Sequence, residues 1–365
     1  MRVLHISSPH SWRGGEQQIA YLLEELRAQD VQQWVACPQG SALADYCAKH
    51  QFPTMLYNKR FSVNPAVGQK IARFCRQQSI EVMHAHDSHA HTFGVMAKAF
   101  FGAKSALVVH RRVDFPIGKS LLSNWKYNHA AVDLIICVSS MIESVVQKGL
   151  KRAIPTRVVY SGVRLDRFAQ VPQGSIRAEL GLGQHAILIG NVAALAPHKD
   201  YPTFVRTANL LLEQGHDTHF VLIGGDGGEM ERIKALIGES RHQQRFHLLG
   251  FRADIPSLLP QLNVFLFTSE TEGLGTSVID AFLAKVPVVA TRAGGVPELV
   301  QHGQTGLLAP VKDHQQLAQL VAETRSDQHA TRQRIQQAFE AAQHFGKAQM
   351  AQQILNAYRV ILPHS

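Results

Sequence analysis

The sequence predicts an α/β protein made of two doubly wound, Rossmann-like halves. The chain has 365 residues, more than one hydrophobic core usually supports, so two domains of roughly 150 to 200 residues are expected. Short apolar runs alternate with amphipathic stretches along its whole length, which indicates parallel sheets with helical crossovers. Glycine-rich or acidic segments follow several of these runs, where parallel sheets bind their ligands.

The first half contains a strand, a helix and then a series of further strands. Residues 2–7 read as a strand, and 16–28 as a helix with Ile19, Leu22 and Leu26 on one face. The remaining predicted strands of this half cover residues 34–37, 54–57, 82–85, 105–109, 134–138 and 156–159.

The second half repeats this alternation. Its predicted strands cover residues 186–192, 219–224, 246–249, 264–267 and 286–290, and residues 302–308 read as a closing turn and strand. A last helix is expected over about 331–360.

The charge of the chain indicates attraction to anions. A formal net charge of +9 suits nucleic acid, anionic lipid headgroups or phosphorylated glycans. No zinc-finger spacing or aromatic-rich sheet motif is present, so no nucleic-acid partner is expected. A peripheral membrane face, with 100–101 and 115–117 as apolar contacts, competes with a merely soluble basic surface. The basic residues of the first half include Lys98, Lys104, Arg111, Arg112, Lys119, Lys126, Lys148, Lys151, Arg152 and Arg157.

Targeting signals and cysteine usage indicate a cytoplasmic protein. No run of about 18 apolar residues could span a bilayer, and the first strand is too short for a signal peptide. The cysteines Cys37, Cys47, Cys75 and Cys137 lack paired spacing and are expected to be free, buried thiols.

Residues 269–281 (SETEGLGTSVIDA) are the most informative stretch. They lie between the strand at 264–267 and a helix expected over 278–284, so the loop sits at a strand's carboxyl end, where helix N–H groups can hold a phosphate. Glu272 would face the ligand from the loop and Asp280 from the first helical turn. The alternative for Asp280 is a capping box with Ser277.

The spacing of Glu272 and Asp280 resembles the acidic motif of retaining glycosyltransferase family 4, in which a glutamate takes the second position. Residues 294–298 (GGVPE) resemble the family's Gly-Gly-x-Pro-Glu turn. This resemblance implies the GT-B fold, with two Rossmann-like βαβ domains facing each other across a cleft. The expected parts are an acceptor-binding domain (1–163), a donor-binding domain (164–345) and a helix at 346–365 that crosses back to the first domain.

The resemblance also implies the donor contacts. Glu272 would hold the donor sugar, Asp280 the ribose, and Lys199 the diphosphate as a point charge, although the arginine that assists it in the family is Ala194 here. A solvated loop charge is the alternative for Lys199. The other expected donor-binding residues are Gly273, Leu274, Gly275 and Thr276 of the loop, and Phe251 in the segment that reads the base.

The first half is expected to supply the acceptor side. Gly14 and Gly15 open the first helix and would place N–H groups near the donor phosphate or the transferred sugar, with a tight turn as the alternative. The resemblance implies that either His110 or Arg112 takes the family's functional histidine position, and His110 is the expected occupant. Arg111 and Arg112 are expected to bind the acceptor.

Four histidines raise the question of a metal. Zinc binding by His84, His86, His89 and His91 is possible by spacing, but relatives carry a similar His-x-His without metal. The family also lacks an Asp-x-Asp metal device, so no metal and no cofactor are expected.

The resemblance implies a retaining transferase that moves a sugar from a UDP- or GDP-sugar to a glycan or lipid-linked acceptor. Synthesis of lipopolysaccharide or another envelope polysaccharide is expected, in the cytoplasm or on the inner face of the cytoplasmic membrane. A nucleotide-sugar 2-epimerase and a catalytically silent scaffold remain as alternatives.

Overall fold

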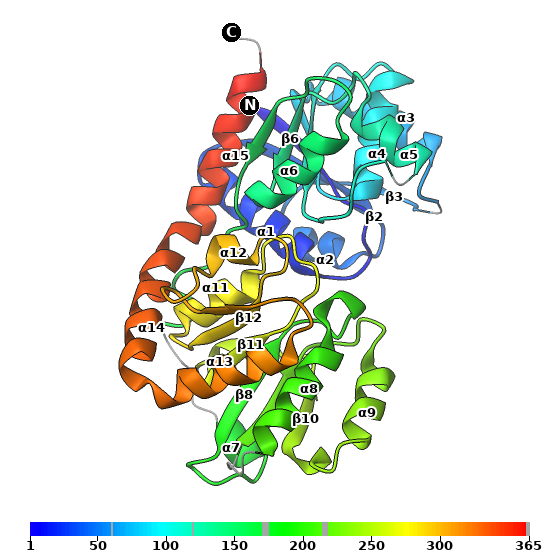
Figure 1. Cartoon of the computed structure of the whole chain (residues 1–365). Coiled ribbons are helices and arrows are strands. Elements are labelled where there is room, and N and C mark those ends of the chain that lie inside the picture. The colour runs from blue at the N-terminus through cyan, green and yellow to red at the C-terminus, as the bar shows by residue number, and fades with distance from the viewer. Residues whose placement is uncertain (60, 119, 170–174, 214–217, 363–365) are drawn as a thin grey trace. The chain divides into compact units, whose positions relative to one another are not determined.

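The computed structural model describes residues 1–59, 61–118, 120–169, 175–213 and 218–362. The chain forms two compact units (Figure 1). Unit 1 comprises Met1–Gly162 with Lys347–Ser365, and unit 2 comprises Val163–Gly346. Lys119, one of the basic residues of the first half, lies outside the described residues.

Unit 1 is built on a seven-stranded parallel sheet in the order β3-β2-β1-β4-β5-β6-β7. All seven strands predicted for the first half are confirmed; most are apolar runs buried by helices packed on the sheet, and the edge strand β7 is the half-exposed exception. They are β1 (Arg2–Ile6), β2 (Gln32–Pro38), β3 (Thr54–Tyr57), β4 (Val82–Ala85), β5 (Ala106–Arg111), β6 (Leu134–Cys137) and β7 (Thr156–Val158).

Most helices of unit 1 begin at a polar side chain that accepts a hydrogen bond from the first helical turn. In α4, for example, the Asp87 carboxylate accepts hydrogen bonds from the amides of His89 and Ala90, each at 3.0 Å. All four cysteines are buried free thiols, as predicted. The helices are α1 (Gly14–Arg27), α2 (Ala42–Lys49), α3 (Pro65–Gln77), α4 (Ser88–Ala99), α5 (Leu121–Tyr127), α6 (Ser140–Gly149) and α15 (Lys347–Ile361).

The end of the chain differs from the single helix predicted over 331–360. The structure has α14 (Gln328–Ala342), a short 3-10 turn η4 (Gln343–Phe345) and then α15. Gly346 between them is extended, with φ −66° and ψ 142°, so the helix is interrupted there. α15 packs on α1 of unit 1 through buried residues such as Ile354 and Tyr358.

Unit 2 contains a six-stranded parallel sheet in the order β10-β9-β8-β11-β12-β13. Its strands are β8 (Ile187–Val192), β9 (Thr218–Ile223), β10 (Phe246–Gly250), β11 (Val264–Phe267), β12 (Val288–Thr291) and β13 (Leu307–Ala309). The helices are α7 (Ile176–Glu179), α8 (Tyr201–Leu212), α9 (Met230–Gly238), α10 (Ile255–Leu258), α11 (Thr276–Leu283), α12 (Val296–Leu299), α13 (His314–Ser326) and α14, with 3-10 turns η1 (Pro197–Lys199), η2 (Gln243–Arg245) and η3 (Leu259–Gln261).

The strand order of each unit reverses direction at one place. In unit 1 this place lies between β1 and β4, because the strand that follows β1 in the chain and the strand that follows β4 lie on opposite sides of this pair in the sheet. In unit 2 the same holds for β8 and β11. Ligands of doubly wound sheets bind outside the carboxyl ends of such strands. The topology of unit 2 therefore predicts a ligand-binding site at the loops after β8 and β11.

Candidate active site

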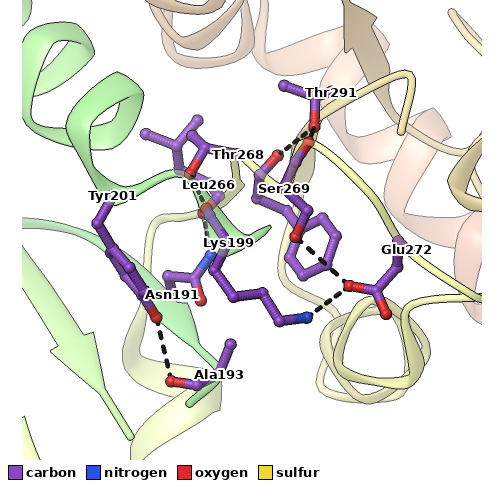
Figure 2. Close-up of polar contacts among 10 residues, drawn as sticks. Asn191, Ala193, Lys199, Tyr201, Leu266, Thr268, Ser269, Glu272 and Thr291 are labelled. Carbon is purple, nitrogen blue, oxygen red and sulfur yellow. Dashed lines mark hydrogen bonds and ion pairs between the residues drawn. The ribbon is translucent and has the colours of Figure 1, made fainter. Parts of the chain in front are cut away.

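An ion pair joins the two loops at the point where the sheet of unit 2 reverses. Lys199 ends η1 after β8, and Glu272 lies in the loop between β11 and α11. The Lys199 Nζ donates to Glu272 Oε2 at 2.5 Å, and the side chains are 14% and 16% exposed (Figure 2). Ser269 Oγ lies 3.4 Å from the same carboxylate oxygen. A mostly buried cation and carboxylate therefore stand together where the fold places a ligand.

Buried hydroxyl and amide groups hold these loops in place. Thr268 Oγ1 donates to the Lys199 carbonyl at 3.0 Å, and Thr291 Oγ1 donates to the Ser269 carbonyl at 2.6 Å (Figure 2). The Asn191 side-chain amide donates to the Leu266 carbonyl at 2.8 Å. Sequence reasoning missed these supports; the signal was a polar residue at the end of each apolar strand.

Gly294 fixes the backbone beneath Glu272. Its φ of +51° lies in the left-handed region, and a Cβ placed there would come within 1.9 Å of the Glu272 carbonyl oxygen. The next amide, that of Gly295, donates to this carbonyl at 3.0 Å. The Gly-Gly turn therefore positions Glu272 from behind.

Replacing Gly294→Ala is expected to displace the Glu272 loop and abolish the nucleotide binding that the family resemblance implies, because a backbone atom occupies the methyl position. Gly303→Ala is the matched control: its φ is +82°, but no heavy atom lies within 4 Å of the position that the alanine methyl would take. The control should lose only about 1–2 kcal/mol of unfolding free energy, from backbone strain. Titration calorimetry would measure nucleotide binding, and scanning calorimetry would measure the free energy of unfolding. Equal nucleotide binding and equal stability of the two variants would contradict the role of Gly294 in positioning Glu272.

The start of α11 differs slightly from the prediction. The helix begins at Thr276 rather than Val278, because Gly275 takes a left-handed conformation with φ +95° and serves as its N-cap. Leu274 is buried beneath the loop, at 3% exposure. Glu272, Leu274, Gly275 and Thr276 thus stand in one continuous turn, as the sequence indicated.

Asp280 does not cap α11. The helix has no side-chain cap, and Asp280 Oδ2 instead accepts from Arg167 Nη1 at 2.6 Å. The capping-box alternative with Ser277 is therefore wrong. Asp280 Oδ1 is buried and has no hydrogen-bond partner among the described residues, so it could accept from a ligand hydroxyl. Arg167 was missed because it lies 113 residues earlier in the chain.

Burial raises the pKa of Asp280 to about 6, although Arg167 opposes the shift. The folded chain therefore keeps this proton up to about pH 6, whereas the unfolded chain releases it near its ordinary pKa of 3.8. Between these values the unfolding free energy should fall as pH rises, by up to about 3 kcal/mol. Asp280→Asn should flatten that part of the profile while its amide oxygen still accepts from Arg167. Denaturation at several pH values would measure this, and identical slopes for the two proteins would contradict it.

The loops after β8, β9 and β10 also meet at this edge of the sheet. A Cβ on Gly224 would come within 1.8 Å of the Ala193 carbonyl oxygen, and one on Gly225 would lie 3.8 Å from the Phe251 Cβ. Phe251 follows β10 and is 80% exposed. This edge of unit 2 therefore carries all of the donor residues predicted for the second half.

The predicted glycines of unit 1 stand at an open helix start. Gly14 and Gly15 begin α1, and a Cβ placed on either would have no heavy atom within 4 Å. Glu16 Oε2 accepts from the Arg13 amide at 3.0 Å, closing the first turn. The space before the helix therefore allows close approach by a ligand.

His110 and Arg112, the two candidates for the functional histidine position, are neighbours in the structure. Arg112 Nη2 lies 3.3 Å from His110 Nδ1, and His110 is 4% exposed at the end of β5. Burial lowers the pKa of Arg112 to about 10. The Arg111 guanidinium donates to the Tyr127 hydroxyl at 2.8 Å and to the Phe115 carbonyl, so it holds the loop that follows β5. Its acceptor role stays a prediction, as do the roles of His110 and Arg112.

The histidines at 84–91 do not act as one group. His84 and His86 join His5 of β1, with His5 Nδ1 3.0 Å from His86 Nε2. In the described part of the chain, these three histidines form the one group of three or more histidine, cysteine or acidic side chains whose ligand atoms lie close enough to share a metal ion. Burial holds their pKa values low, that of His5 at about 4, and the charge of Arg112 acts on His84 and His86 in the same direction. The same positive charge disfavours a metal cation.

His91 lies elsewhere. Its Nε2 is 3.1 Å from the Lys126 carbonyl oxygen, and its ring packs edge-on against Tyr127. The zinc set suggested by spacing therefore does not assemble.

Two family models match successive parts of the chain. Residues 12–167 match the model described as "Glycosyltransferase Family 4", and residues 173–341 match "Glycosyl transferases group 1". Together they cover most of both units, and they leave out β1 at the start of the chain and η4 and α15 at its end.

Among curated proteins, the chain is 24% identical over 254 residues to the N-acetyl-alpha-D-glucosaminyl L-malate synthase of Bacillus anthracis, covering 68% of this chain and 66% of that protein. The chain thus spans just under two thirds of that relative's length. It is 25% identical over 295 residues to the UDP-Gal:alpha-D-GlcNAc-diphosphoundecaprenol alpha-1,3-galactosyltransferase of Escherichia coli, covering 76% of each.

Among solved structures, Anabaena Alr3699/HepE in complex with UDP and glucose superposes with a TM-score of 0.83. The sequences are 24% identical, and the match covers 99% of this chain and 100% of that one. At this identity the likeness shows the fold, which is that of GT-B glycosyltransferases.

Proposed function

Since the chain belongs to the glycosyltransferase family of these two models, we propose that it transfers a sugar from a nucleotide diphosphate sugar to a glycan or lipid-linked acceptor with retention of configuration. The observation that carries this proposal is the Lys199–Glu272 pair at the carboxyl edge of the unit 2 sheet. A lone structural ion pair would not need the glycine turns at Gly275 and Gly294 around it.

The donor is proposed to be a UDP- or GDP-sugar held without a metal ion. Lys199 and the amides at the start of α11 would face the diphosphate, and the unpartnered Asp280 Oδ1 would accept from a ribose hydroxyl. Ala194 stands where the family resemblance implies an assisting arginine, which would give Lys199 a larger share of the charge neutralisation. A UDP donor is favoured by the names of the Escherichia coli relative and the Anabaena complex.

The reaction would break the bond between the anomeric carbon and the diphosphate oxygen. Lys199 and the backbone dipoles would stabilise the leaving diphosphate, where negative charge develops. The acceptor hydroxyl would attack from the same face and give its proton to a phosphate oxygen of the donor. Glu272 would orient the sugar, and no side chain would form a covalent intermediate.

The acceptor is proposed to bind at the carboxyl edge of the unit 1 sheet, near His110 and Arg112. Envelope polysaccharide synthesis, including that of lipopolysaccharide, on the inner face of the cytoplasmic membrane fits this family. The support is the Escherichia coli relative, which is named for a lipid-linked acceptor.

Thermal unfolding with UDP, GDP, ADP or CMP tests the donor site. A ligand that binds only the folded chain raises the melting temperature, by an amount set by its concentration relative to Kd. One nucleoside diphosphate should stabilise the protein equally with magnesium or with a chelator. Stabilisation that requires magnesium would refute the metal-free proposal, and no stabilisation by any of the four would refute the donor site.

A further inference from the structure

Unit 1 carries a group of exposed apolar side chains around the start of α5. The most exposed is Leu121, at 90%, followed by Phe100 at 63%, Phe115 at 60% and Leu122 at 37%. Single exposed apolar residues are ordinary, but several in neighbouring segments mark a contact surface. These four residues are called the α5 patch below.

Three contacts hold the α5 patch together. The Phe100 ring, at the end of α4, stacks on Trp125 of α5 with 6.1 Å between ring centroids. Arg111 binds both the Tyr127 hydroxyl at the end of α5 and the Phe115 carbonyl, which ties the Phe115 loop to this helix. The patch is therefore a built surface of α4, α5 and the preceding loop, whose helices are neighbours in Figure 1.

A basic segment borders the same helix. The Lys151 amide donates to Asn128 Oδ1 at 2.5 Å, and Arg152 Nη1 donates to the His129 carbonyl at 2.9 Å, both just beyond the end of α5. Lys148, Lys151 and Arg152 are exposed. Gly149 packs against Ile117 of the loop that carries Phe115, so this segment lies beside the patch.

Acidic residues are scarce in this region. Between Asp87 and Asp133 the sequence contains one acid, Asp114, against six lysines and arginines, of which Arg111 and Lys126 are buried. Lys98 is paired with Asp133, but Lys104, four residues after Phe100 in the sequence, is exposed. An apolar group with a basic border and almost no opposing charge complements a surface that is apolar inside and negatively charged outside.

We propose that the α5 patch docks on a bilayer that contains anionic phospholipid. Leu121, Phe115 and Phe100 enter the boundary between headgroups and acyl chains, while Lys148, Lys151 and Arg152 lie among the anionic headgroups. Among the described residues no helix is long and apolar enough to cross a membrane, so this contact is peripheral. Docking would bring a lipid-linked acceptor to the enzyme; that consequence rests on the proposed function, whereas docking itself does not.

Vesicle sedimentation tests the proposal without donor or acceptor, so its failure is distinguishable from failure of the transferase assignment. Wild-type protein should sediment with phosphatidylcholine vesicles that contain roughly 30% phosphatidylglycerol, and much less with phosphatidylcholine alone. The double variant Phe115→Ser/Leu121→Ser should bind at least about tenfold more weakly. The matched control is Val360→Ser, which removes a 68% exposed apolar side chain from α15 of the same unit and should bind as wild type.

The contribution of the basic residues and the insertion of the patch into the bilayer are tested separately. Lys148→Glu/Lys151→Glu should weaken binding about tenfold or more, and salt should weaken wild-type binding in the same direction. Leu121→Trp should bind at least as well as wild type, with a blue-shifted emission when vesicles are added. Equal binding of the serine double variant and the Val360→Ser control would overturn the proposal, as would wild-type protein that stays in solution with anionic vesicles at low salt. If the emission of the Leu121→Trp variant were the same on bound vesicles as in solution, insertion of the patch would be overturned.

Discussion

Glu272→Gln is expected to lower turnover of the nucleotide sugar by roughly a hundredfold or more while the protein stays folded. The change keeps the shape of the side chain but removes the carboxylate that lies 2.5 Å from Lys199. The donor sugar would lose its strongest hydrogen-bond acceptor at the reacting end. Nucleotide release in the presence of acceptor, or slow donor hydrolysis in its absence, would measure the loss.

The matched control is Glu270→Gln, two residues earlier in the same loop. Glu270 is 36% exposed and pairs with Lys312, itself 62% exposed, so the change should alter turnover by less than about twofold. Full turnover by Glu272→Gln would refute the assignment of the donor site. Equal losses in both variants would point to a general disturbance of the loop instead.

Lys199→Ala should weaken binding of the nucleoside diphosphate by about a hundredfold. The lysine is 14% exposed, so its charge is poorly screened, and no arginine stands at position 194 to replace it. Its loss also leaves the Glu272 carboxylate without its cation. Isothermal titration with the nucleotide that stabilises wild type gives the change in Kd.

Lys312→Ala removes an exposed lysine from an ion pair with the same loop and should leave Kd nearly unchanged. Unfolding of Lys199→Ala, Glu272→Gln and the double variant should show a coupling of about 0.5–3 kcal/mol. Unchanged nucleotide affinity in Lys199→Ala would contradict the diphosphate role, even if the coupling were found.

The fold was predictable because most strands are apolar runs with a boundary that a neighbouring polar turn marks. Residues 264–267 and 54–57 were predicted with the bounds that the structure has. The start of α11 was missed by two residues because the left-handed conformation of Gly275 cannot be read from the letter alone. The break at Gly346 was missed because the surrounding sequence is helix-forming on both sides.

The candidate site was predictable where its residues share one loop and not where they come from distant segments. Glu272, Gly275 and Asp280 stood out through their spacing, and the resemblance added Lys199. The Arg167–Asp280 pair and the His5–His86 contact depend on tertiary packing, so no local pattern indicated them. The histidine spacing misled because His91 faces Lys126 and Tyr127 in the fold.

The anomer of the sugar first released by donor hydrolysis tests the central claim most directly. Proton NMR, recorded before the sugar mutarotates, distinguishes the two anomers with water as acceptor, so the natural acceptor need not be known. A retaining transferase should release the α anomer from an α-linked nucleotide sugar, and Glu272→Gln should release little of either. Initial release of the β anomer by wild-type protein would contradict the proposed mechanism.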